Sequence, residues 1–557
     1  MSGSWLQDEI TMQPDPRSRG RGSRRARITP GLLVRMLAIV ASATQGSFAN
    51  AGDWLQFGFD AAHSGVNPDE AGIAGRVGEF RQIYATPLPA DVDGSPVYLE
   101  NVRSAGITRN LLFMTTAYGA TFAVDAADGQ QVWMQTTYGP APIVGASPAI
   151  DPGRLFVYGA GVDGKVHKYN IGDGSEVMDA YWPEIVTLKP GVEKMSSALV
   201  FASAADGHTY LYATTSNFGY DRGDYQGHVT AIDLASGAQR VFNMLCSNIG
   251  EHLAMAPASP NCADAQAGIW GRPGVVYDAF TDRIYLTTGN GPYSPGGLGH
   301  SWGESVLSLP PAMTGPGGAA LSAPLDSYTP DEYADLNSYD LDLGVESPAI
   351  LPAPVGSNIR NLGVQIGKDG IARLLDLDNL SGHGAPGYAG GEIGLVSNLD
   401  YRGSLNTQPA VWTDPQNGST WLLAAYQSAV YGFLVQANTR GKPELVNAWS
   451  LAVGGTSPVV ADGVMFFVAQ TNDLRALDAR TGALLWSAPV TGVHWASPIV
   501  VDGTVFLTDN GATLRAFAAP EAIAPMQSRF ALTSGARPAR PVYRLREGPN
   551  QDRAKPN

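Results

Sequence analysis

The sequence predicts an all-β, eight-bladed β-propeller in which each blade is a four-stranded antiparallel sheet. Three observations predict this fold: a composition rich in Gly (66) and Pro (39), short apolar stretches between Gly, Asp and Asn turns, and a unit that recurs eight times. Many short strands joined by tight turns have this signature. A hydrophobic fraction of 44% is ample for a large core.

The clearest copy of the recurring unit runs from residue 457 to residue 486. It opens with Ser-Pro-Val-Val, continues with Asp-Gly-Val-Met-Phe-Phe and ends with Ala-Leu-Asp-Ala-Arg-Thr-Gly and a Trp. The next copy runs from Ser497 to Phe517. Earlier copies open at Ser95, Ser147, Ser196, Gly274, Ser347 and Gln408. Because one sheet cannot bury both of its faces, such repeats are stable when they stack radially.

Each unit predicts four strands joined by hairpins. The alternating apolar stretches are the strands, and the Asp-Gly pairs supply the positive φ that tight hairpin turns require. The Trp that ends the unit is expected on the last strand, facing the neighbouring blade. The blade formed by residues 497–518 stops early, and Trp54–Phe57 are expected to supply its missing strand and close the ring.

The two ends of the chain are predicted to lie outside the propeller of residues 52–520. Residues 1–51 have the features of an export leader: an Arg-rich block, an apolar run at 32–43 and the small-x-small triplet Ala49-Asn50-Ala51. The apolar run is too short to span a membrane. The leader therefore predicts a periplasmic or secreted protein, and Ser23-Arg24-Arg25 is similar to the twin-arginine export signal. The basic, Pro-rich residues 521–557 are expected to be a disordered tail.

Charge and cysteine content exclude several function classes. A formal charge of −15, with basic stretches only at the two ends, argues against a nucleic-acid partner. In an oxidising compartment the two cysteines, Cys246 and Cys262, predict one structural disulfide. Because the chain has no Cys-x-x-Cys-His motif, no c-type haem is expected on it.

The pattern at Ala476–Trp486 resembles that of the pyrroloquinoline-quinone (PQQ) repeat family, and the resemblance covers roughly residues 52–520. That family includes both quinoprotein dehydrogenases and non-catalytic propellers, so the resemblance by itself does not select a function. In the dehydrogenases a Trp stacks on PQQ, and Glu, Asn and sometimes Asp hold a divalent or lanthanide cation. An Asp acts as the base, and Arg or Lys contacts the quinone.

Five residues of this chain match those positions by resemblance. The segments Ile269–Gly271 and Ile284–Asn290 are similar to those that carry the stacking Trp and the cation-binding Asn, which would be Trp270 and Asn290. Tyr339–Asp342 resembles the segment that carries the base, which would be Asp340, with Asp342 as an additional carboxylate near the metal. Gln365–Gly370 resembles the turn whose basic side chain bonds the quinone, which would be Lys368.

Each of these assignments has a structural alternative. Trp270 could serve inter-blade packing, and Asn290 could belong to an Asn-Gly turn. Asp340 and Asp342 could form a turn at a blade edge, and Lys368 could be a solvated residue before a hairpin.

Two departures from the family pattern weaken the resemblance to the enzymes. The metal-binding Glu is expected shortly before Gly227–Ala231, but Arg222 occupies that position, so Asp221 or Asp224 would have to replace it. The disulfide between adjacent cysteines that many family enzymes carry is also absent.

The resemblance implies two alternative functions. The first is a dehydrogenase that depends on PQQ and on Ca²⁺ or a lanthanide, oxidises an alcohol or a sugar and passes electrons to a separate acceptor. The second is a non-catalytic propeller that binds proteins or polymers in the cell envelope. A converging set of carboxylates in the central funnel is the feature that distinguishes the enzyme from the scaffold.

Overall fold

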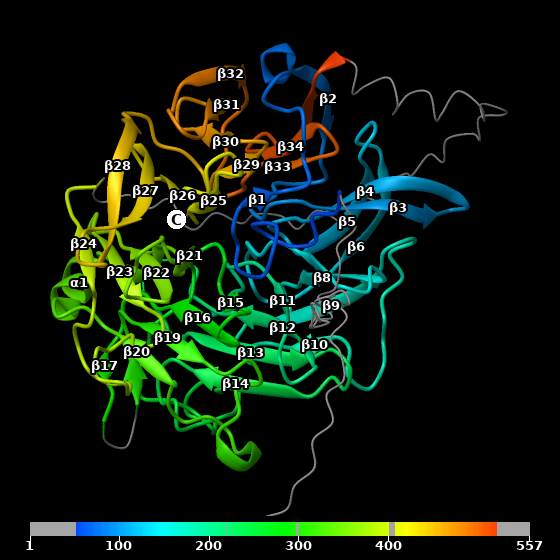
Figure 1. Ribbon diagram of the computed structural model, residues 1–557. Coiled ribbons are helices and arrows are strands. Elements are labelled where there is room, and N and C mark those ends of the chain that lie inside the picture. The colour runs from blue at the N-terminus through cyan, green and yellow to red at the C-terminus, as the bar shows by residue number, and fades with distance from the viewer. Residues whose placement is uncertain (1–51, 220, 297–299, 400–406, 521–557) are drawn as a thin grey trace, which may run out of the picture. The chain divides into compact units, whose positions relative to one another are not determined.

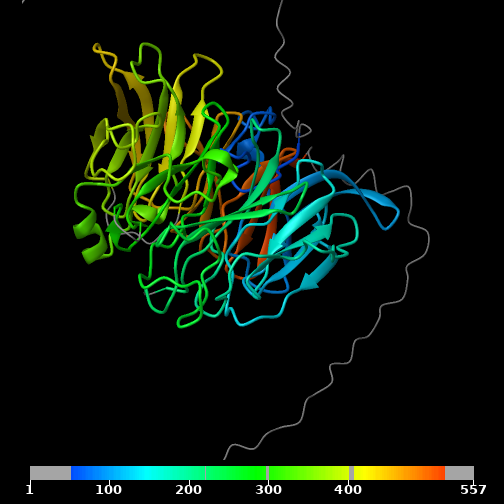
Figure 2. The same ribbon diagram turned by 90° about the horizontal axis from the view of Figure 1, so that it is seen from below.

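The computed structural model describes residues 52–219, 221–296, 300–399 and 407–520. The expected leader and tail lie outside the described residues. The described chain forms eight four-stranded antiparallel sheets, which follow one another around a ring (Figures 1 and 2). The prediction of an all-β, eight-bladed propeller is therefore confirmed.

The first four blades follow the chain in order. Blade 1 consists of β3 (Val97–Ser104), β4 (Ile107–Thr115), β5 (Ala120–Asp125) and β6 (Gln131–Thr136). Blade 2 consists of β7 (Ala149–Ile150), β8 (Phe156–Ala160), β9 (Lys165–Asn170) and β10 (Glu184–Ile185). Blade 3 consists of β11 (Val200–Ser203), β12 (Thr209–Thr214), β13 (His228–Asp233) and β14 (Gln239–Asn243). Blade 4 consists of β15 (Val276–Asp278), β16 (Arg283–Thr287), β19 (Val306–Leu309) and β20 (Asp326–Tyr328).

The remaining blades complete the ring. Blade 5 consists of β21 (Ala349–Pro352), β22 (Asn361–Ile366), β23 (Ala372–Asp376) and β24 (Gly394–Val396). Blade 6 consists of β25 (Ala410–Thr413), β26 (Thr420–Ala425), β27 (Val430–Ala437) and β28 (Pro443–Leu451). Blade 7 consists of β29 (Val459–Ala461), β30 (Val464–Ala469), β31 (Asp473–Asp478) and β32 (Leu484–Pro489). Blade 8 consists of β33 (Ile499–Val501), β34 (Thr504–Asp509), β35 (Thr513–Ala518) and β2 (Arg81–Pro87).

A few elements lie outside the blades. The helix α1 (Tyr333–Tyr339) belongs to the connection between blades 4 and 5, and β17 (Tyr293–Ser294) pairs with β18 (Ser301–Trp302) in a small ribbon. The strand β1 (Val66–Asn67) adds to blade 7 in parallel with β29. Three short 3-10 turns cover Val77–Glu79, Pro316–Gly318 and Leu343–Val345.

The turns form as their sequences predict. In blade 7, Asp462 and Gly463 both have positive φ, 50° and 74°, and they connect β29 directly to β30. Asp502 and Gly503 repeat this turn in blade 8, with φ of 52° and 69°. Two consecutive positive φ values match the right-handed twist of the flanking strands, which is why Asp-Gly pairs recur in the repeat.

The Trp that ends the repeat joins blade 1 to blade 2 and blade 6 to blade 7. Trp449, on β28 of blade 6, donates its indole N–H to the carbonyl oxygen of Ala479 in blade 7 at 3.2 Å. Its ring lies against Gly482, where a Cβ atom would come within 2.6 Å of the ring. Trp133 of blade 1 lies in the same way against Gly174 of blade 2. The glycine of the repeat therefore supplies both a positive φ and the space for the neighbouring ring.

Residues 54–67, which we call the inner belt, run along the first strands of the blades. These strands lie innermost in the ring (Figure 1). The inner belt makes hydrogen bonds to the first strands of seven blades in chain order: Trp54 to Tyr98, Leu55 to Ile150, Gln56 to Phe201, Ala61 to Tyr277, Ser64 to Val411, Gly65 to Val460 and Asn67 to Val500. It satisfies backbone groups that would otherwise face the axis unpaired.

The expectation that Trp54–Phe57 supply the fourth strand of blade 8 is wrong. That strand is β2, which pairs antiparallel with β35. Trp54 instead forms an isolated bridge with Tyr98 of blade 1. Residues of Trp54–Phe57 instead make hydrogen bonds to the inner edges of the blades. Arg81–Pro87 form a strand that is long enough to pair with all of β35.

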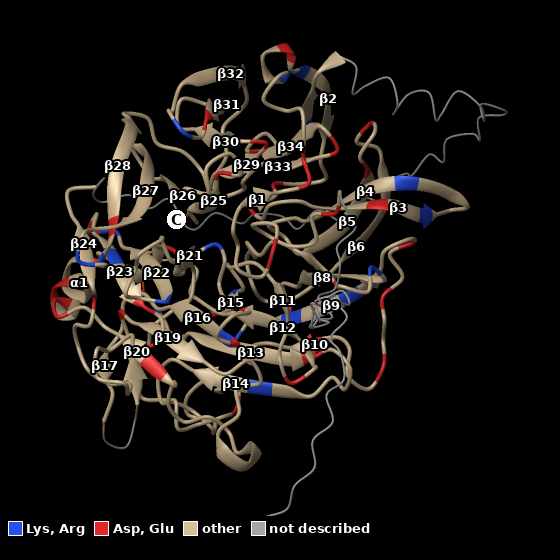
Figure 3. Ribbon diagram, viewed as in Figure 1, with Lys and Arg blue, Asp and Glu red and all other residues tan. Residues whose placement is uncertain are grey.

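Charged side chains are sparse among the described strands. Figure 3 shows Asp and Glu spread through the loops and turns, with fewer Lys and Arg among them. No helix of the described residues has the length and the hydrophobicity to cross a membrane.

We predict that Gly482→Ala destabilises the protein more than Gly418→Ala does. Both glycines have positive φ, 69° and 75°, but a Cβ at Gly418 would meet open space. The control should lose about 1 kcal/mol from backbone strain alone, and Gly482→Ala should lose about 1–3 kcal/mol more from the clash with Trp449. Urea unfolding measures both losses of stability. Equal losses would show that the Trp449 ring does not require a glycine at position 482.

Candidate functional site

The connectivity of the blades brings distant loops to one face of the ring. In each blade, the turn between the second and third strands and the connection to the next blade lie at the same end of the strands. Asp221, Asn290 and Lys368 lie in such turns of blades 3, 4 and 5. Trp270 lies in the connection between blades 3 and 4, and Asp340 and Asp342 lie in the connection between blades 4 and 5.

These residues surround one cavity of about 330 Å³. Six of the seven candidate residues for base, cofactor and metal line it: Asp221, Trp270, Asn290, Asp340, Asp342 and Lys368. The other lining residues are Lys194, Ser196, Ser216, Asn217, Phe218, Gly219, Tyr225, Gly268 and Trp495. The structure thus brings together side chains that lie almost 150 residues apart between Asp221 and Lys368.

Asn290 lies at the centre of the acidic part of the cavity. Its side-chain amide donates to Asp221 Oδ2 at 3.0 Å and to Asp340 Oδ1 at 3.2 Å. Its backbone N–H donates to Asp342 Oδ1 at 2.7 Å. The amide oxygen of Asn290 is buried and has no hydrogen-bond partner among the described residues. Asn290 therefore contacts three carboxylates and keeps one unpaired amide oxygen of its own.

Asp221 and Asp224, which the sequence left as alternatives, lie in different surroundings. Asp221 accepts hydrogen bonds from Tyr225 Oη at 2.6 Å and from Asn217 Nδ2 at 3.1 Å, both within the cavity wall. Asp224 does not line the cavity and instead accepts from the backbone N–H of Ala256 at 3.0 Å. Of these two carboxylates, only Asp221 is placed to contact a ligand in the cavity.

Lys368 connects the acidic residues to the aromatic wall. Its Nζ donates to Asp340 Oδ1 at 3.1 Å and forms an ion pair with Asp342. The same Nζ lies 5.0 Å from the centre of the Trp270 ring. Burial acts to lower the pKa of Lys368, but the charges of Asp342 and Asp340 outweigh it and the pKa is raised. Lys368 is therefore a permanent cation of the cavity at neutral pH.

The two carboxylates of the 340–342 segment differ in exposure. Asp340 ends α1 in the left-handed conformation, with φ of 55°, and its side chain is 70% exposed. Asp342 is buried, and burial raises its pKa to about 6 although Lys368 opposes the shift. Asp340 is thus the carboxylate that is accessible to a substrate, and Asp342 supports Lys368 and Asn290 from within.

Close to Asp342 lies a buried acid, Glu304, that the sequence analysis did not select. Glu304 is fully buried and accepts a hydrogen bond from the backbone N–H of Leu343 at 2.7 Å. Burial and then the charge of Asp342 raise the pKa of Glu304 well above its ordinary value. A single acid within an otherwise uncharged stretch, Ser301–Leu309, was the available signal.

Another part of the cavity wall is basic, and the sequence analysis did not select its residues either. Lys194 lines the cavity with only 7% of its surface exposed, and its Nζ lies 5.4 Å from the centre of the Trp495 ring. Burial lowers the pKa of Lys194 to about 8, with Asp93 acting against the shift. Trp495 also contacts Arg272, whose guanidinium carbon is 5.7 Å from the centre of that ring.

Among the described residues, Arg272 donates its hydrogen bonds to three backbone carbonyl groups. Its guanidinium donates to the carbonyl oxygens of Ser196, Asp93 and Gly145 at 3.0, 3.1 and 3.0 Å. Burial lowers the pKa of Arg272 to about 10. Since these carbonyl groups belong to the connections that lead into blades 3, 1 and 2, Arg272 joins three blades at the axis.

A short segment, Gln266–Gly268, separates the loops that carry Asp221 and Asn290. The backbone N–H of Gln266 donates to Tyr225 O at 2.8 Å, and that of Ala267 donates to Asn290 O at 2.6 Å. Gln266 and Ala267 both have positive φ, 94° and 52°, which is unusual for residues other than Gly. This segment therefore sets the spacing between two carboxylate-bearing loops.

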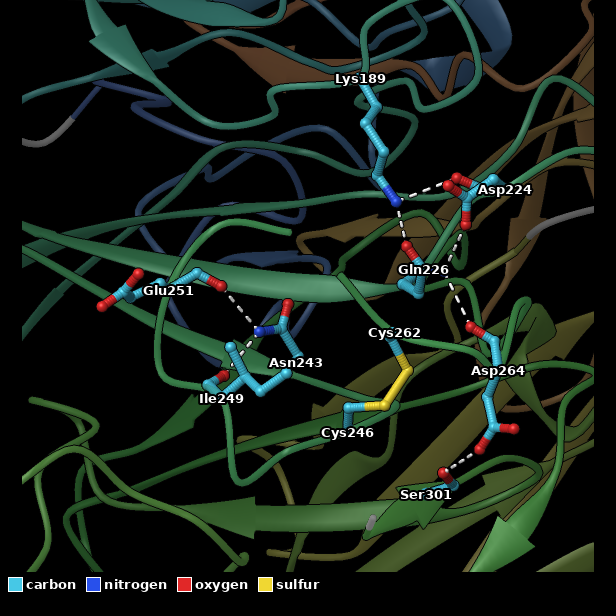
Figure 4. The surroundings of a disulfide bond; sticks show 10 residues. All are labelled: Lys189, Asp224, Gln226, Asn243, Cys246, Ile249, Glu251, Cys262, Asp264 and Ser301. Carbon is cyan, nitrogen blue, oxygen red and sulfur yellow. Dashed lines mark hydrogen bonds between the residues drawn. A yellow bond between two sulfur atoms is a disulfide. The ribbon is translucent and has the colours of Figure 1, made fainter. Parts of the chain in front are cut away.

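The predicted disulfide between Cys246 and Cys262 is confirmed and lies just before this segment. Figure 4 shows the hydrogen bonds beside it, in which Gln226 donates to the carbonyl oxygen of Asp264 at 2.8 Å and Ser301 donates to its carboxylate at 2.8 Å. Gln226 also accepts from the buried Lys189. The disulfide and this network hold Gln266–Gly268 between blades 3 and 4.

The residue types of the acidic part fit a hard cation. Such ions prefer carboxylate and amide oxygens, and Asp221, Asp340 and the unused oxygen of Asn290 supply both kinds. No group of three or more His, Cys, Asp or Glu side chains able to hold a metal ion is found in the described part of the chain. A cation here would therefore need Asn290 as one of its ligands.

Comparisons with known proteins agree with this fold. The sequence profile of a family described as outer membrane protein assembly factor BamB matches residues 91–248 and 414–524. Quinohemoprotein alcohol dehydrogenase ADHIIG from Pseudomonas putida HK5 is similar over 89% of this chain and 82% of its own, with 13% identity and a TM-score of 0.60. A europium-containing methanol dehydrogenase is similar over 84% of this chain and 98% of its own, with 15% identity and a TM-score of 0.59.

A third solved structure is that of quinohemoprotein alcohol dehydrogenase from Comamonas testosteroni. It covers 85% of this chain and 81% of its own, with 17% identity and a TM-score of 0.59. No curated protein matches the chain. The resemblance to the PQQ-repeat β-propellers is confirmed, and identities of this size show the fold but not the activity.

We predict that Lys194→Met stabilises the ligand-free protein at pH 7. A pKa lowered from 10.5 to about 8 means that burial disfavours the charged amine, at about 1.4 kcal/mol for each unit, so the gain should be about 1–3 kcal/mol. The penalty is complete below the folded pKa and is relieved as pH rises from 8 towards 10.5, where the unfolded chain also loses its proton.

Urea unfolding at pH 7 and at pH 9.5 measures this effect. The difference between variant and parent should shrink at the higher pH. Lys165→Met is the control, because the Lys165 side chain is 37% exposed and lies outside the cavity. A loss of stability in Lys194→Met at pH 7 would contradict the prediction.

Proposed function

We propose that this protein is an exported dehydrogenase that depends on PQQ and a metal ion and oxidises an alcohol or a sugar. The observation that supports it is the convergence of an aromatic ring, a cation and three carboxylates on one cavity: Trp270, Lys368, Asp221, Asp340 and Asp342. These side chains come from turns of blades 3 and 5 and from the connections on either side of blade 4. A propeller that acts only as a scaffold does not require such a convergence.

In this proposal Asp221 and Asn290 hold the metal ion, which is Ca²⁺ or a lanthanide, with Asp342 as an additional carboxylate near it. The Asn290 amide is oriented with its nitrogen towards Asp221 and Asp340. Because the two ends of an amide are interchangeable by rotation, Asn290 can instead present its unpaired oxygen. Asp221 takes the part of the Glu that the family pattern places at Arg222. A bound cation supplies Lewis-acid polarisation.

Trp270 and Lys368 would hold the quinone. The Trp270 ring offers a flat apolar face, and Lys368 lies over that face at 5.0 Å as a cation able to donate to a quinone oxygen. A bound PQQ supplies the acceptor for the two electrons of the alcohol. The chain's only two cysteines form the Cys246–Cys262 bond, so a disulfide between adjacent cysteines does not contribute to this cavity.

Asp340 would act as the general base. Its carboxylate is exposed and is oriented by Lys368 and Asn290, so it can accept the proton of a substrate hydroxyl as the carbon is oxidised. Asp342 keeps Lys368 charged and in place. Electrons would leave to a separate acceptor, since the chain carries no c-type haem motif. The leader sequence supports a periplasmic or secreted location for this chemistry.

The competing proposal is a non-catalytic propeller that binds proteins or polymers of the cell envelope. The match to the BamB family profile favours it. A non-catalytic propeller does not explain why the protein bears the free-energy cost of burying the acidic cluster and Lys194. A scaffold has no use for charges that converge on an interior cavity.

The purified protein is expected to retain PQQ after desalting when Ca²⁺ or La³⁺ is present. It should then reduce a dye with at least one member of a panel of alcohols and sugars. Asp340→Asn should retain the cofactor but lower kcat by at least about 100-fold, the usual contribution of a general base. Failure to retain PQQ with any metal would remove the enzyme proposal, and unchanged turnover would show that Asp340 is not the base.

Asp221→Asn is expected to weaken cation binding by at least about tenfold, because a carboxylate ligand is lost. Terbium luminescence sensitised by the cavity tryptophans measures the affinity. Asp224→Asn is the matched control, since Asp224 lies in the same loop but outside the cavity, and it should change the affinity by less than about twofold. Equal effects of the two substitutions would contradict the assignment of Asp221.

A further inference from the structure

A buried ion pair lies next to the loop that carries Asp221. Lys189 Nζ is 2.9 Å from Glu193 Oε1, and the two side chains are 0% and 1% exposed. Both residues belong to the connection between blades 2 and 3, and neither lines the cavity. Thr187 donates its hydroxyl to the other carboxylate oxygen of Glu193. Taking two charges out of water is costly, and their mutual attraction often does no more than offset that cost. Stability alone therefore does not account for this ion pair.

The ion pair bonds to the chain on both sides of Tyr225. Lys189 Nζ donates to the carbonyl oxygen of Asp224 at 2.9 Å and to the side-chain oxygen of Gln226 (Figure 4). Glu193 Oε1 accepts from the backbone N–H of Gln226 at 2.9 Å. Each of these hydrogen bonds includes a charged group and is therefore stronger than a bond between neutral groups. An apolar pair of the same volume could fill this space but could not hold the backbone of residues 224–226.

Tyr225 connects the ion pair to the cavity. Its side chain is 2% exposed and lines the cavity, and its hydroxyl donates to Asp221 Oδ1 at 2.6 Å. Its carbonyl oxygen accepts from the backbone N–H of Gln266 at 2.8 Å. The second carboxylate oxygen of Asp221 accepts from the side-chain amide of Asn290 at 3.0 Å. The position of Tyr225 therefore determines how the carboxylate of Asp221 is presented beside Asn290.

We propose that Lys189 and Glu193 are positioning residues: their ion pair holds Tyr225 in place, and the Tyr225 hydroxyl in turn orients Asp221 for binding a cation. The proposal rests on the proposed function only for the identity of the ligand, a Ca²⁺ or lanthanide ion. Groups that orient a metal ligand without touching the metal commonly change the affinity by about tenfold to a hundredfold. That contribution gives the buried charges a role that stability does not.

Replacing the ion pair by apolar residues tests the role. Lys189→Met combined with Glu193→Leu removes both charges together, so that no uncompensated charge stays buried, and the fold is expected to persist in urea unfolding. The affinity for Tb³⁺, measured by sensitised luminescence, should fall by about tenfold or more. Arg480→Met combined with Asp414→Leu is the control, since that ion pair joins blades 7 and 6 outside the cavity. The control should leave the Tb³⁺ affinity unchanged, and an unchanged affinity in the first variant would overturn the proposal.

The number of water molecules on the bound ion gives a readout that a loss of stability alone does not change. Luminescence lifetimes of bound Tb³⁺ in H₂O and D₂O measure this number. Because a water oxygen takes the place of a lost carboxylate oxygen, the Lys189–Glu193 double variant should hold about one more water molecule than the parent. Tyr225→Phe, which removes only the hydroxyl group, should show the same increase. The same water count in parent and Tyr225→Phe would contradict the role of the hydroxyl.

The Asp221→Asn background shows whether the ion pair acts through Asp221. Once Asp221 no longer supplies a carboxylate, the double substitution of Lys189 and Glu193 should weaken Tb³⁺ binding by less than about twofold, since two changes on one route are not additive. A further loss of the full size in this background would mean that the ion pair acts by another route and would overturn the proposal.

Hydrogen exchange distinguishes a failure of this proposal from a failure of the proposed function, because it requires no metal ion. The backbone N–H groups of Gln226 and Gln266 should exchange at least about tenfold faster in the Lys189–Glu193 double variant than in the parent and the control. Mass spectrometry of the peptides that contain them measures the exchange. Faster exchange in a protein whose parent binds no Tb³⁺ would refute the proposed function and still support the positioning of Tyr225. Unchanged exchange would overturn the positioning role in either case.

Discussion

The inner edges of the eight blades impose the constraint on which the rest of the structure depends. Each first strand leaves backbone N–H and carbonyl groups facing the axis, where its own sheet has no further strand to pair with them. The inner belt of residues 54–67 satisfies these edges in seven blades. Arg272 satisfies carbonyl groups of the connections into three blades. The ring is therefore held from the inside by two segments that lie about 200 residues apart in sequence.

The use of Arg272 to bond these carbonyl groups places a positive charge near the axis, where the fold would otherwise be apolar. Arg272 can reach three connections at once because its guanidinium offers several donors in one plane, but its positive charge then remains near the axis. Lys194 adds a second buried cation, while Glu304 and Glu346 are fully buried acids whose pKa values are raised well above the ordinary value by burial. Neighbouring blades are also joined further out, by uncharged contacts such as Trp449 on Gly482 and by ion pairs such as Arg480 with Asp414. The buried cations Arg272 and Lys194 thus lie near the axis and the cavity.

The sequence predicts those features that depend on a local pattern. The repeat yields the eight blades, the Asp-Gly turns and the tryptophan contacts, and two lone cysteines yield the disulfide. Resemblance to the PQQ-repeat family also selects five residues that share the cavity: Trp270, Asn290, Asp340, Asp342 and Lys368. Asp221 and Asp224 could not be told apart, because the direction of a side chain in an irregular loop depends on contacts such as Tyr225 with Asp221. Lys194 and the inner belt were missed because their partners are distant in sequence and no periodicity marks them.

The geometry of the cavity is therefore a property of contacts between loops and not of any single blade. Gln266 and Ala267 adopt a strained backbone conformation, which persists because hydrogen bonds to Tyr225 and Asn290 hold it from both sides. The disulfide and Asp264 fix the same segment from its N-terminal side. Because Asp221 and Asn290 are connected through this segment, a change in one loop is transmitted to the other. The blades could tolerate extensive exchange of core residues of similar volume, whereas the distance between Asp221 and Asn290 depends on their own hydrogen bond and on a few backbone contacts of Gln266–Gly268.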